Sequence, residues 1–215
     1  MNLLQLQLDL VSQAAQRLAE SDIEPYFALR EMLARNEKRE CRLFREQFAK
    51  YYGLNAAGVT DTFKTRYFEL LFDLKLHPDI PPPYEQLLLE LHPIKRRKGD
   101  NVLAASFVSK LVAMHDESRP LFDRHVSHFF GLYVPSAGPL EFRIAGFVSN
   151  LDTIRGYYLA WSKEPEFRSV IAALKNKIPS LESCRDVRIC DFLVWTVGRQ
   201  RIGAPPKPTK RARLK

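Results

Sequence analysis

The chain has 215 residues, a formal net charge of +8 and 27% charged residues, a composition that is ordinary for a globular protein. No stretch approaches about 18 consecutive apolar residues, and the N-terminus lacks the basic and continuous apolar regions of a signal peptide, so we expect neither a membrane span nor secretion. The three cysteines, Cys41, Cys184 and Cys190, form no paired framework, which favours a reducing, cytoplasmic setting.

The positive charge is concentrated at the C-terminus. Residues 201–215 carry six Lys and Arg side chains and no acid, which leaves a net charge of only +2 for residues 1–200. Because this segment is also rich in proline, we expect a disordered basic tail. Such a tail serves either as a solubilising end or as a tether to phosphate backbones.

The N-terminal part of the chain is predicted to be helical. Apolar residues at helical spacing predict a first helix over residues 3–19. We expect a second helix to open at Glu24-Pro25, because proline suits the first helical turn. A third helix is predicted within residues 41–54.

Two more helices are expected before the middle of the chain. Thr60 and Asp61 are candidate N-terminal caps for a helix over residues 62–75. The segment 78–83, PDIPPP, is a rigid break that suggests a sub-domain boundary near residues 77–83. A short helix within residues 84–94 follows it.

A basic loop then leads into the most apolar helix of the sequence. Residues 102–115 are apolar on every side of a helical wheel, which is typical of a central helix, and Lys110 lies among these apolar positions. We expect Asp100 and Asn101 to cap this helix. The loop before it carries four consecutive cations, Lys95, Arg96, Arg97 and Lys98.

The remaining pattern is helical as well, and no strand-like alternation occurs. We therefore predict an all-α fold with eight to ten helices, in a single domain over residues 1–200 followed by the tail. The last predicted helices cover residues 124–132, 140–164, 166–178 and 184–198.

Asp123 is the leading candidate for chemistry. It directly precedes the helix that starts at Arg124, so its carboxylate can cap the backbone N–H groups of that helix. A carboxylate at the start of a helix beside a buried helix can also face a pocket, where it stabilises a cationic transition state or positions a water molecule. One side chain can do both.

Lys110 is the second candidate. It either extends its ammonium group to the surface or, if buried, must pair or lose its proton. Asp123 follows across one turn, so the two side chains can meet. A lysine with a lowered pKa is also a possible amine nucleophile.

Other polar and aromatic groups have simpler interpretations. Three or four convergent ligands are needed for zinc, and His115, His125 and His128 do not have a matching spacing. The adjacent pair His115-Asp116 raises the possibility of an HD-type metal-dependent phosphohydrolase, with His92 and either Asp152 or Asp186 as further ligands. Four aromatic residues can stack on bases but at helical spacing are expected in the core: Tyr157, Tyr158, Trp161 and Trp195.

The segment 91–126, from LHPIKRRKGDN through PLFDRHV, resembles the helix-hairpin-helix DNA glycosylases of the 8-oxoguanine-glycosylase fold. The family element P-[IV]-x-D-x-[HN]-V is matched by Pro120, Asp123, His125 and Val126. The resemblance implies that Asp123 is the catalytic aspartate and that the target base is flipped out of the duplex. The family hairpin carries a GxG-like turn, whereas this chain has only Gly99. The family's Schiff-base lysine lies near the helix start, so that role is not carried over to Lys110.

We therefore predict a DNA-binding N-glycosylase that releases a damaged or modified base, in repair or in phage defence, without a metal or cofactor. Asp123 and Lys110 are the predicted catalytic-site residues. The predicted DNA contacts are Lys95, Arg96, Arg97, Lys98 and His125. The alternatives are a non-catalytic helical module that binds nucleic acid and the HD-type phosphohydrolase.

Overall fold

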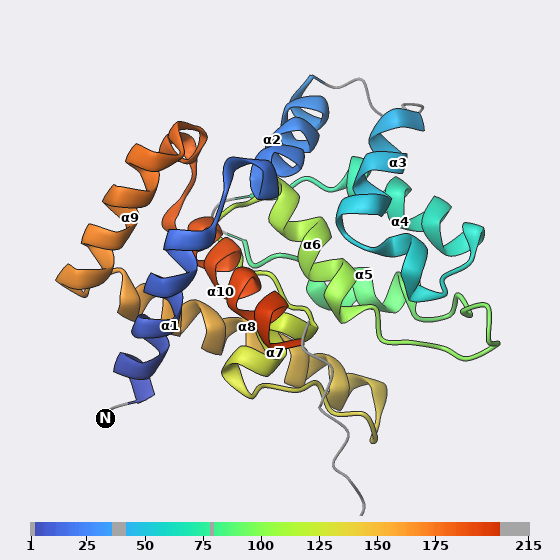
Figure 1. The fold of residues 1–215 in the computed structure, drawn as a ribbon. Coiled ribbons are helices and arrows are strands. Elements are labelled where there is room, and N and C mark those ends of the chain that lie inside the picture. Colours follow the sequence, from blue (N-terminus) through green and yellow to red (C-terminus); the bar gives the residue numbers. More distant parts are fainter. Residues whose placement is uncertain (1–2, 36–41, 78–79, 203–215) are drawn as a thin grey trace, which may run out of the picture.

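The computed structural model describes residues 3–35, 42–77 and 80–202. Over these residues the protein consists of ten α-helices and two short 3-10 helices with no strand, which confirms the all-α prediction (Figure 1). The elements are α1 (Leu3–Arg17), α2 (Glu20–Ala34), α3 (Arg42–Tyr51), η1 (Leu54–Ala57), α4 (Asp61–Asp73), α5 (Tyr84–Leu91), α6 (Ala105–His115), α7 (Arg124–Phe130), α8 (Leu140–Trp161), α9 (Pro165–Lys177), η2 (Pro179–Ser183) and α10 (Asp186–Ile202).

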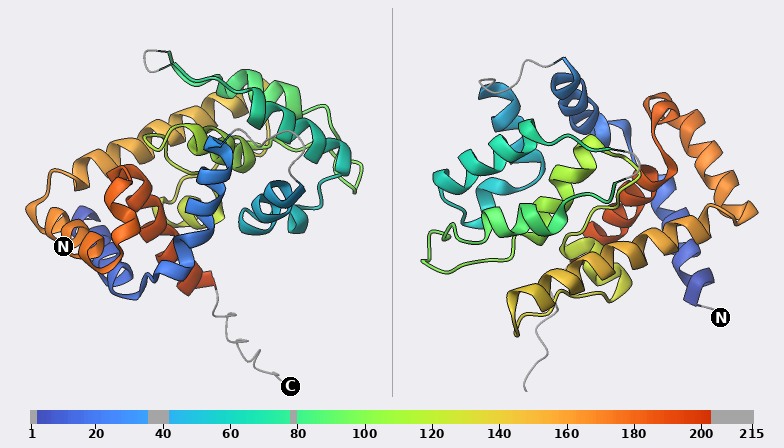
Figure 2. Two further views of the ribbon diagram at one scale, coloured as in Figure 1. Left: turned by 90° about the horizontal axis from the view of Figure 1, so that it is seen from above. Right: turned by 180° about the vertical axis from the view of Figure 1, so that it is seen from behind.

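Helix α6 occupies the centre of the molecule, as its apolar sequence predicts (Figure 1). It lies between a lobe formed by α3, α4 and α5 and a second group in which α10 packs against α1 and α7. The long helix α8 runs across the back (Figure 2, right). Every residue of α6 from Val108 to Met114 is buried, including Lys110, of which only 8% is exposed.

The core is continuous across the proline-rich segment. Leu71 and Tyr67 before this segment and Leu87 and Leu91 after it belong to the same hydrophobic cluster, which extends from Leu8 to Val197. Burial of this cluster supplies the main driving force for folding. None of the helices in the described ranges is both long and apolar enough to cross a membrane.

Two predicted helix starts are wrong. Helix α2 begins at Glu20 and contains Pro25 in its interior, because Asp22 accepts a hydrogen bond from the backbone N–H of Ala19 (3.2 Å) and fixes the earlier start. The proline leaves the carbonyl of Ser21 without its helical partner, but Ser21 is an exposed residue at the first turn of the helix.

Helix α6 begins at Ala105 rather than Val102, and neither Asp100 nor Asn101 caps it. Asp100 instead pairs with Arg96, and Asn101 donates to the carbonyl of His92 at 2.8 Å. Gly99 makes this turn possible because its φ of 85° lies in the left-handed region that glycine favours.

The predicted cap of α4 is confirmed, in contrast to those of α6. The hydroxyl of Thr60 accepts from the backbone N–H of Phe63 (3.3 Å), so Thr60 is the N-cap, as expected. At the other end of the chain, α10 continues to Ile202, further than the sequence indicates. The rest of the predicted basic tail, residues 203–215, lies outside the described residues, as does Cys41.

Candidate functional site

Asp123 begins helix α7 and caps it with one of its two carboxylate oxygens. Oδ1 accepts from the backbone N–H groups of His125 (2.8 Å) and Val126 (3.1 Å). Oδ2 accepts no hydrogen bond from any described residue. The carboxylate therefore satisfies the helix end and still presents an oxygen atom for another purpose.

Asp123 lines a cavity of about 530 Å³, which we call the Asp123 cavity. Its volume lies within the range of about 300–1,000 Å³ that is usual for small-molecule sites. The walls come from α2, α3, η1, α6 and α10 as well as from the start of α7. Six aromatic side chains contribute to them: Tyr26, Tyr51, Tyr52, Phe107, Phe192 and Trp195.

Lys110 enters the same cavity from α6. Its Nζ donates to the hydroxyl of Ser106 (2.9 Å) and lies 5.8 Å and 5.7 Å from the ring centres of Tyr52 and Phe107. It forms no salt bridge with any described residue, so it shares a cavity with Asp123 without forming an ion pair with it. Burial lowers the pKa of Lys110, and the negative charge of Asp123 partly opposes this effect.

His125 also lines the cavity. Its ring packs edge-to-face against Trp195 with 6.2 Å between ring centres, and its buried Nδ1 has no hydrogen-bond partner among the described residues. Burial lowers the pKa of His125, which keeps the imidazole neutral near neutral pH. A neutral ring beside Trp195 suits contact with a flat ligand better than contact with a phosphate.

A buried ion pair on α10 holds the segment that leads to Asp123. Asp191 accepts from the backbone N–H of Leu121 with both oxygens (3.1 and 3.2 Å) and from the hydroxyl of Tyr158 (3.0 Å). Arg188 pairs with Asp191 and donates to the carbonyl of Arg119 at 3.2 Å. The polypeptide two and four residues before Asp123 is thus fixed by hydrogen bonds to one helix.

The sequence contains little sign of this ion pair. Arg188 and Asp191 are three residues apart on a helix, a spacing that usually marks an exposed pair. Burial raises the pKa of Asp191, and the positive charge of Arg188 opposes this rise. The signal in the sequence is that both residues interrupt the apolar run of residues 187–195.

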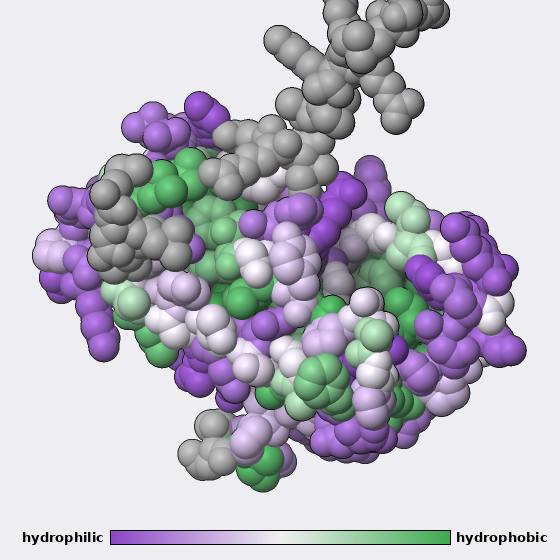
Figure 3. Space-filling view, turned by 90° about the horizontal axis from the view of Figure 1, so that it is seen from below, coloured by the Kyte–Doolittle hydropathy of each residue, from purple (hydrophilic) through white to green (hydrophobic). Residues whose placement is uncertain are grey.

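The four cations of the basic loop do not line the Asp123 cavity. Lys95, Arg97 and Lys98 are exposed, whereas Arg96 pairs with Asp100. The loop is nevertheless attached to one wall of the cavity, because the backbone N–H of Arg97 donates to the carbonyl of Gly58, which follows η1 (2.9 Å). The surface seen from below is hollowed between the right-hand lobe, formed by α3–α5, and the rest of the molecule (Figure 3).

The residues nominated for an HD-type metal site do not come together. Nε2 of His115 lies 2.7 Å from the carbonyl oxygen of Leu71, and Asp116 pairs with Arg119 at 3.0 Å. Within the described ranges, no three His, Cys, Asp or Glu side chains gather in a way that could hold a metal ion. His115 therefore has a packing and hydrogen-bonding role.

Three of the four candidate stacking residues are ordinary aromatic packing residues. Tyr158 and Trp161 are buried, and Tyr157 stacks on Phe130 with 5.0 Å between ring centres. Only Trp195 reaches the Asp123 cavity. Cys190 is fully buried and belongs to the hydrophobic core.

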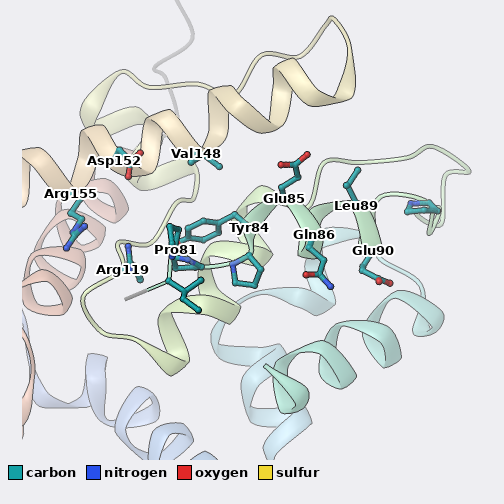
Figure 4. Close-up of a pocket in the computed structure, with 14 residues that line it drawn as sticks. Pro81, Tyr84, Glu85, Gln86, Leu89, Glu90, Arg119, Val148, Asp152 and Arg155 are labelled. Atoms are coloured by element: carbon teal, nitrogen blue, oxygen red, sulfur yellow. The ribbon is translucent and has the colours of Figure 1, made fainter. Parts of the chain in front are cut away.

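A larger groove of about 1150 Å³ lies elsewhere and contains none of the predicted catalytic or DNA-binding residues. We call it the proline groove, because residues 81–83 form part of it. Arg119, Asp152 and Arg155 lie toward one end, Tyr84 lies in the middle, and the later side chains of α5, from Glu85 to Glu90, lie toward the other end (Figure 4). The two predicted catalytic residues, Asp123 and Lys110, therefore both line the smaller Asp123 cavity.

Comparisons with known proteins identify no relative. The chain matches no protein-family model, no curated protein and no solved structure. Any function must therefore be argued from the site itself.

Proposed function

We propose that the protein is a DNA N-glycosylase, which releases an altered base from a nucleotide flipped into the Asp123 cavity. The observation that carries the proposal is the divided role of the Asp123 carboxylate: one oxygen caps α7, the other has no hydrogen-bond partner among the described residues, and the residue lines an aromatic cavity. This arrangement fits the function that the PLFDRHV motif implies.

The chemistry needs only groups that the cavity provides. When the N-glycosidic bond breaks, its electron pair leaves with the base, and positive charge develops on the deoxyribose. An ionised Asp123 stabilises that charge, and it can accept a proton from the water molecule that attacks C1′. The departing base takes up one proton from solvent and Asp123 later releases one to solvent, so the products are the abasic site and the neutral free base.

The rest of the cavity suits a flipped base. Aromatic rings on several walls can stack on its two faces, at about 1–3 kcal/mol per stacked base. Lys110 supplies a hydrogen-bond donor for an acceptor on the base or the sugar. The exposed cations Lys95, Arg97 and Lys98, on a loop attached near η1, can contact the duplex outside the cavity.

The direct test is to incubate the protein with duplexes that each contain one altered base and to quantify abasic sites. We expect at least one duplex to lose its base with the native protein and to keep it with Asp123→Asn. If no duplex in a panel of oxidised, alkylated and deaminated bases yields an abasic site, the glycosylase proposal fails.

A second candidate is a binding module in which Asp123 is only a cap. The observation that favours it is the completeness of the cap itself, with two good hydrogen bonds. It predicts that Asp123→Asn binds DNA like the native protein and that neither protein releases a base.

A further inference from the structure

A second recess adjoins the Asp123 cavity. It has a volume of about 350 Å³, and three residues, Ser106, Asp123 and Arg124, line both spaces. We call it the Arg143 recess, because Arg143 of α8 forms its far side. Asp123 thus lies at the boundary between the Asp123 cavity and the Arg143 recess.

The Arg143 recess is cationic. Arg124 and Arg143 line it, and Asp123 is the single acidic residue among the described residues that do. Arg124 is exposed and has no hydrogen bond or ion pair with any described residue. In the side chain of Arg143, the N–H group of Nε donates a hydrogen bond to the carbonyl of Pro135 (3.1 Å). The N–H groups on its two terminal nitrogens have no partner among the described residues and can donate to a ligand.

A close contact with α8 positions Pro135, which also lines the recess. Pro135 packs so closely on α8 that a Cβ atom at Gly146 would lie 2.7 Å from the Cδ atom of Pro135. Because this contact fixes Pro135, its carbonyl oxygen also fixes the guanidinium group of Arg143. A preorganised arginine loses less entropy when it binds an anion.

We propose that the Arg143 recess binds a phosphodiester group of the nucleotide whose base enters the Asp123 cavity. The inference rests on the proposed function, because it places the deoxyribose at Asp123. The sugar then joins a base on one side to a phosphate on the other, and the recess is the neighbouring space that shares Asp123. Arginine donors match phosphate oxygens in geometry and charge.

The assignment differs from the one that the sequence favours. The sequence indicates phosphate contacts by the loop that carries Lys95 and Lys98, but that loop lines neither space. Its cations remain available for more distant phosphates. The recess instead uses Arg124, next to the catalytic candidate, and Arg143, which is 20 positions further along the chain than Asp123.

The test measures how the affinity for DNA depends on salt concentration. The probe is a short duplex that contains a tetrahydrofuran analogue of an abasic site. Each phosphate contact contributes about −0.9 to the slope of log K against log salt concentration. We expect Arg124→Gln and Arg143→Gln each to make the slope less steep by about that amount.

Arg155→Gln is the matched control. Arg155 is on the same helix as Arg143, is likewise partly exposed and has no hydrogen bond or ion pair with a described residue, but it lines the proline groove. We expect the slope of log K against log salt concentration for Arg155→Gln to equal that of the native protein. Equal slopes for Arg124→Gln, Arg143→Gln and Arg155→Gln would overturn the inference.

A single methylphosphonate next to the abasic analogue locates the contact. It should weaken binding of the native protein by about ten-fold, which corresponds to about 1.4 kcal/mol, and should weaken binding of Arg143→Gln much less. An equal loss for both proteins would place the contact elsewhere and contradict the inference.

This design separates the inference from the proposed function. Reduced slopes without base release from any duplex would support the recess and refute the glycosylase. Base release with unchanged slopes would support the glycosylase and refute the recess. If the native protein does not bind the duplex at all, both are refuted.

Discussion

The guanidinium group of Arg188 lies 2.7 Å from the carboxylate of Asp191, and neither side chain is exposed to solvent. Both groups also bind the segment before Asp123, at the N–H of Leu121 and the carbonyl of Arg119. The candidate catalytic carboxylate is therefore positioned by an ion pair on another helix. Breaking a buried pair is costly, because the remaining charge has no compensation.

We predict that Asp191→Asn destabilises the protein by about 3–5 kcal/mol, since it leaves Arg188 buried without a counter-charge. Urea unfolding monitored by circular dichroism measures the change. The control is Asp186→Asn on the same helix, because Asp186 is half-exposed and lies 3.7 Å from Lys175. Its expected cost is below about 1 kcal/mol. Equal midpoints for Asp191→Asn and native protein would contradict the assignment of a structural ion pair.

We predict that the buried Lys110 makes the folded protein less stable than an apolar residue at the same position would, because its ammonium group serves the ligand in the cavity. Lys110→Met removes a buried ammonium group and loses its hydrogen bond to Ser106 and its contacts with the rings of Tyr52 and Phe107. Because the desolvation cost of the ammonium group is lost as well, we expect the free energy of unfolding to fall by no more than about 1 kcal/mol, or to rise. Base release should decrease in the same variant. A loss of several kcal/mol would show that the ammonium group stabilises the fold.

The stability of the Lys110 variant relative to the native protein should depend on pH. Burial lowers the pKa of Lys110 in the folded protein, so between that pKa and the ordinary value of about 10.4 the unfolded chain binds more protons. The native protein therefore gains stability as pH rises through this range, whereas Lys110→Met does not. From pH 7 to pH 10, the melting temperature of the native protein should rise relative to that of Lys110→Met. A constant difference would contradict a lowered pKa.

A close contact holds the start of α7 against α10. A Cβ atom at Gly198 would lie 2.5 Å from Cβ of His125, so Gly198→Ala forces the two helices apart. We expect a destabilisation of about 1–3 kcal/mol, as for other overpacked sites. Gly156→Ala on α8 is the control, because a Cβ atom at Gly156 would meet no packing neighbour within 4 Å among the described residues, and it should stabilise the protein by about 0.5–1 kcal/mol. The prediction fails if both variants stabilise the protein.

Replacing Asp123 separates its capping role from its charge. Asp123→Ala removes the acceptor for His125 and Val126 and should cost about 0.5–2 kcal/mol. Asp123→Asn keeps an oxygen atom in the capping position, so its free energy of unfolding should stay close to that of the native protein. Thermal melting compares the three proteins, and equal losses for both variants would argue against the capping geometry.

The sequence predicts the helices and the Asp123 cap because these depend on local patterns. The apolar wheel of residues 102–115 correctly indicates a central helix. The sequence leaves open whether Lys110 reaches the surface, and the structure buries it. The start of α6 is predicted wrongly because Asp100 has a competing partner in Arg96. Local cap rules do not describe such competition.

The walls of the cavity could not be predicted in the same way. Tyr26, Tyr52 and Trp195 come from three distant parts of the chain, and only their tertiary packing brings them together. Arg143 is a further example, because nothing near it in the sequence connects it to Asp123. Long-range contacts of this kind leave no periodic signal in one sequence.

The central claim is that the free oxygen of Asp123 acts on a nucleotide and is not merely part of a helix cap. The most direct measurement is the single-turnover rate of base release from a duplex that carries one susceptible base, with native protein and Asp123→Asn at saturating concentration. We predict that the rate falls at least about 100-fold while duplex affinity and melting temperature remain unchanged. A rate for Asp123→Asn within about two-fold of the native rate would contradict the account.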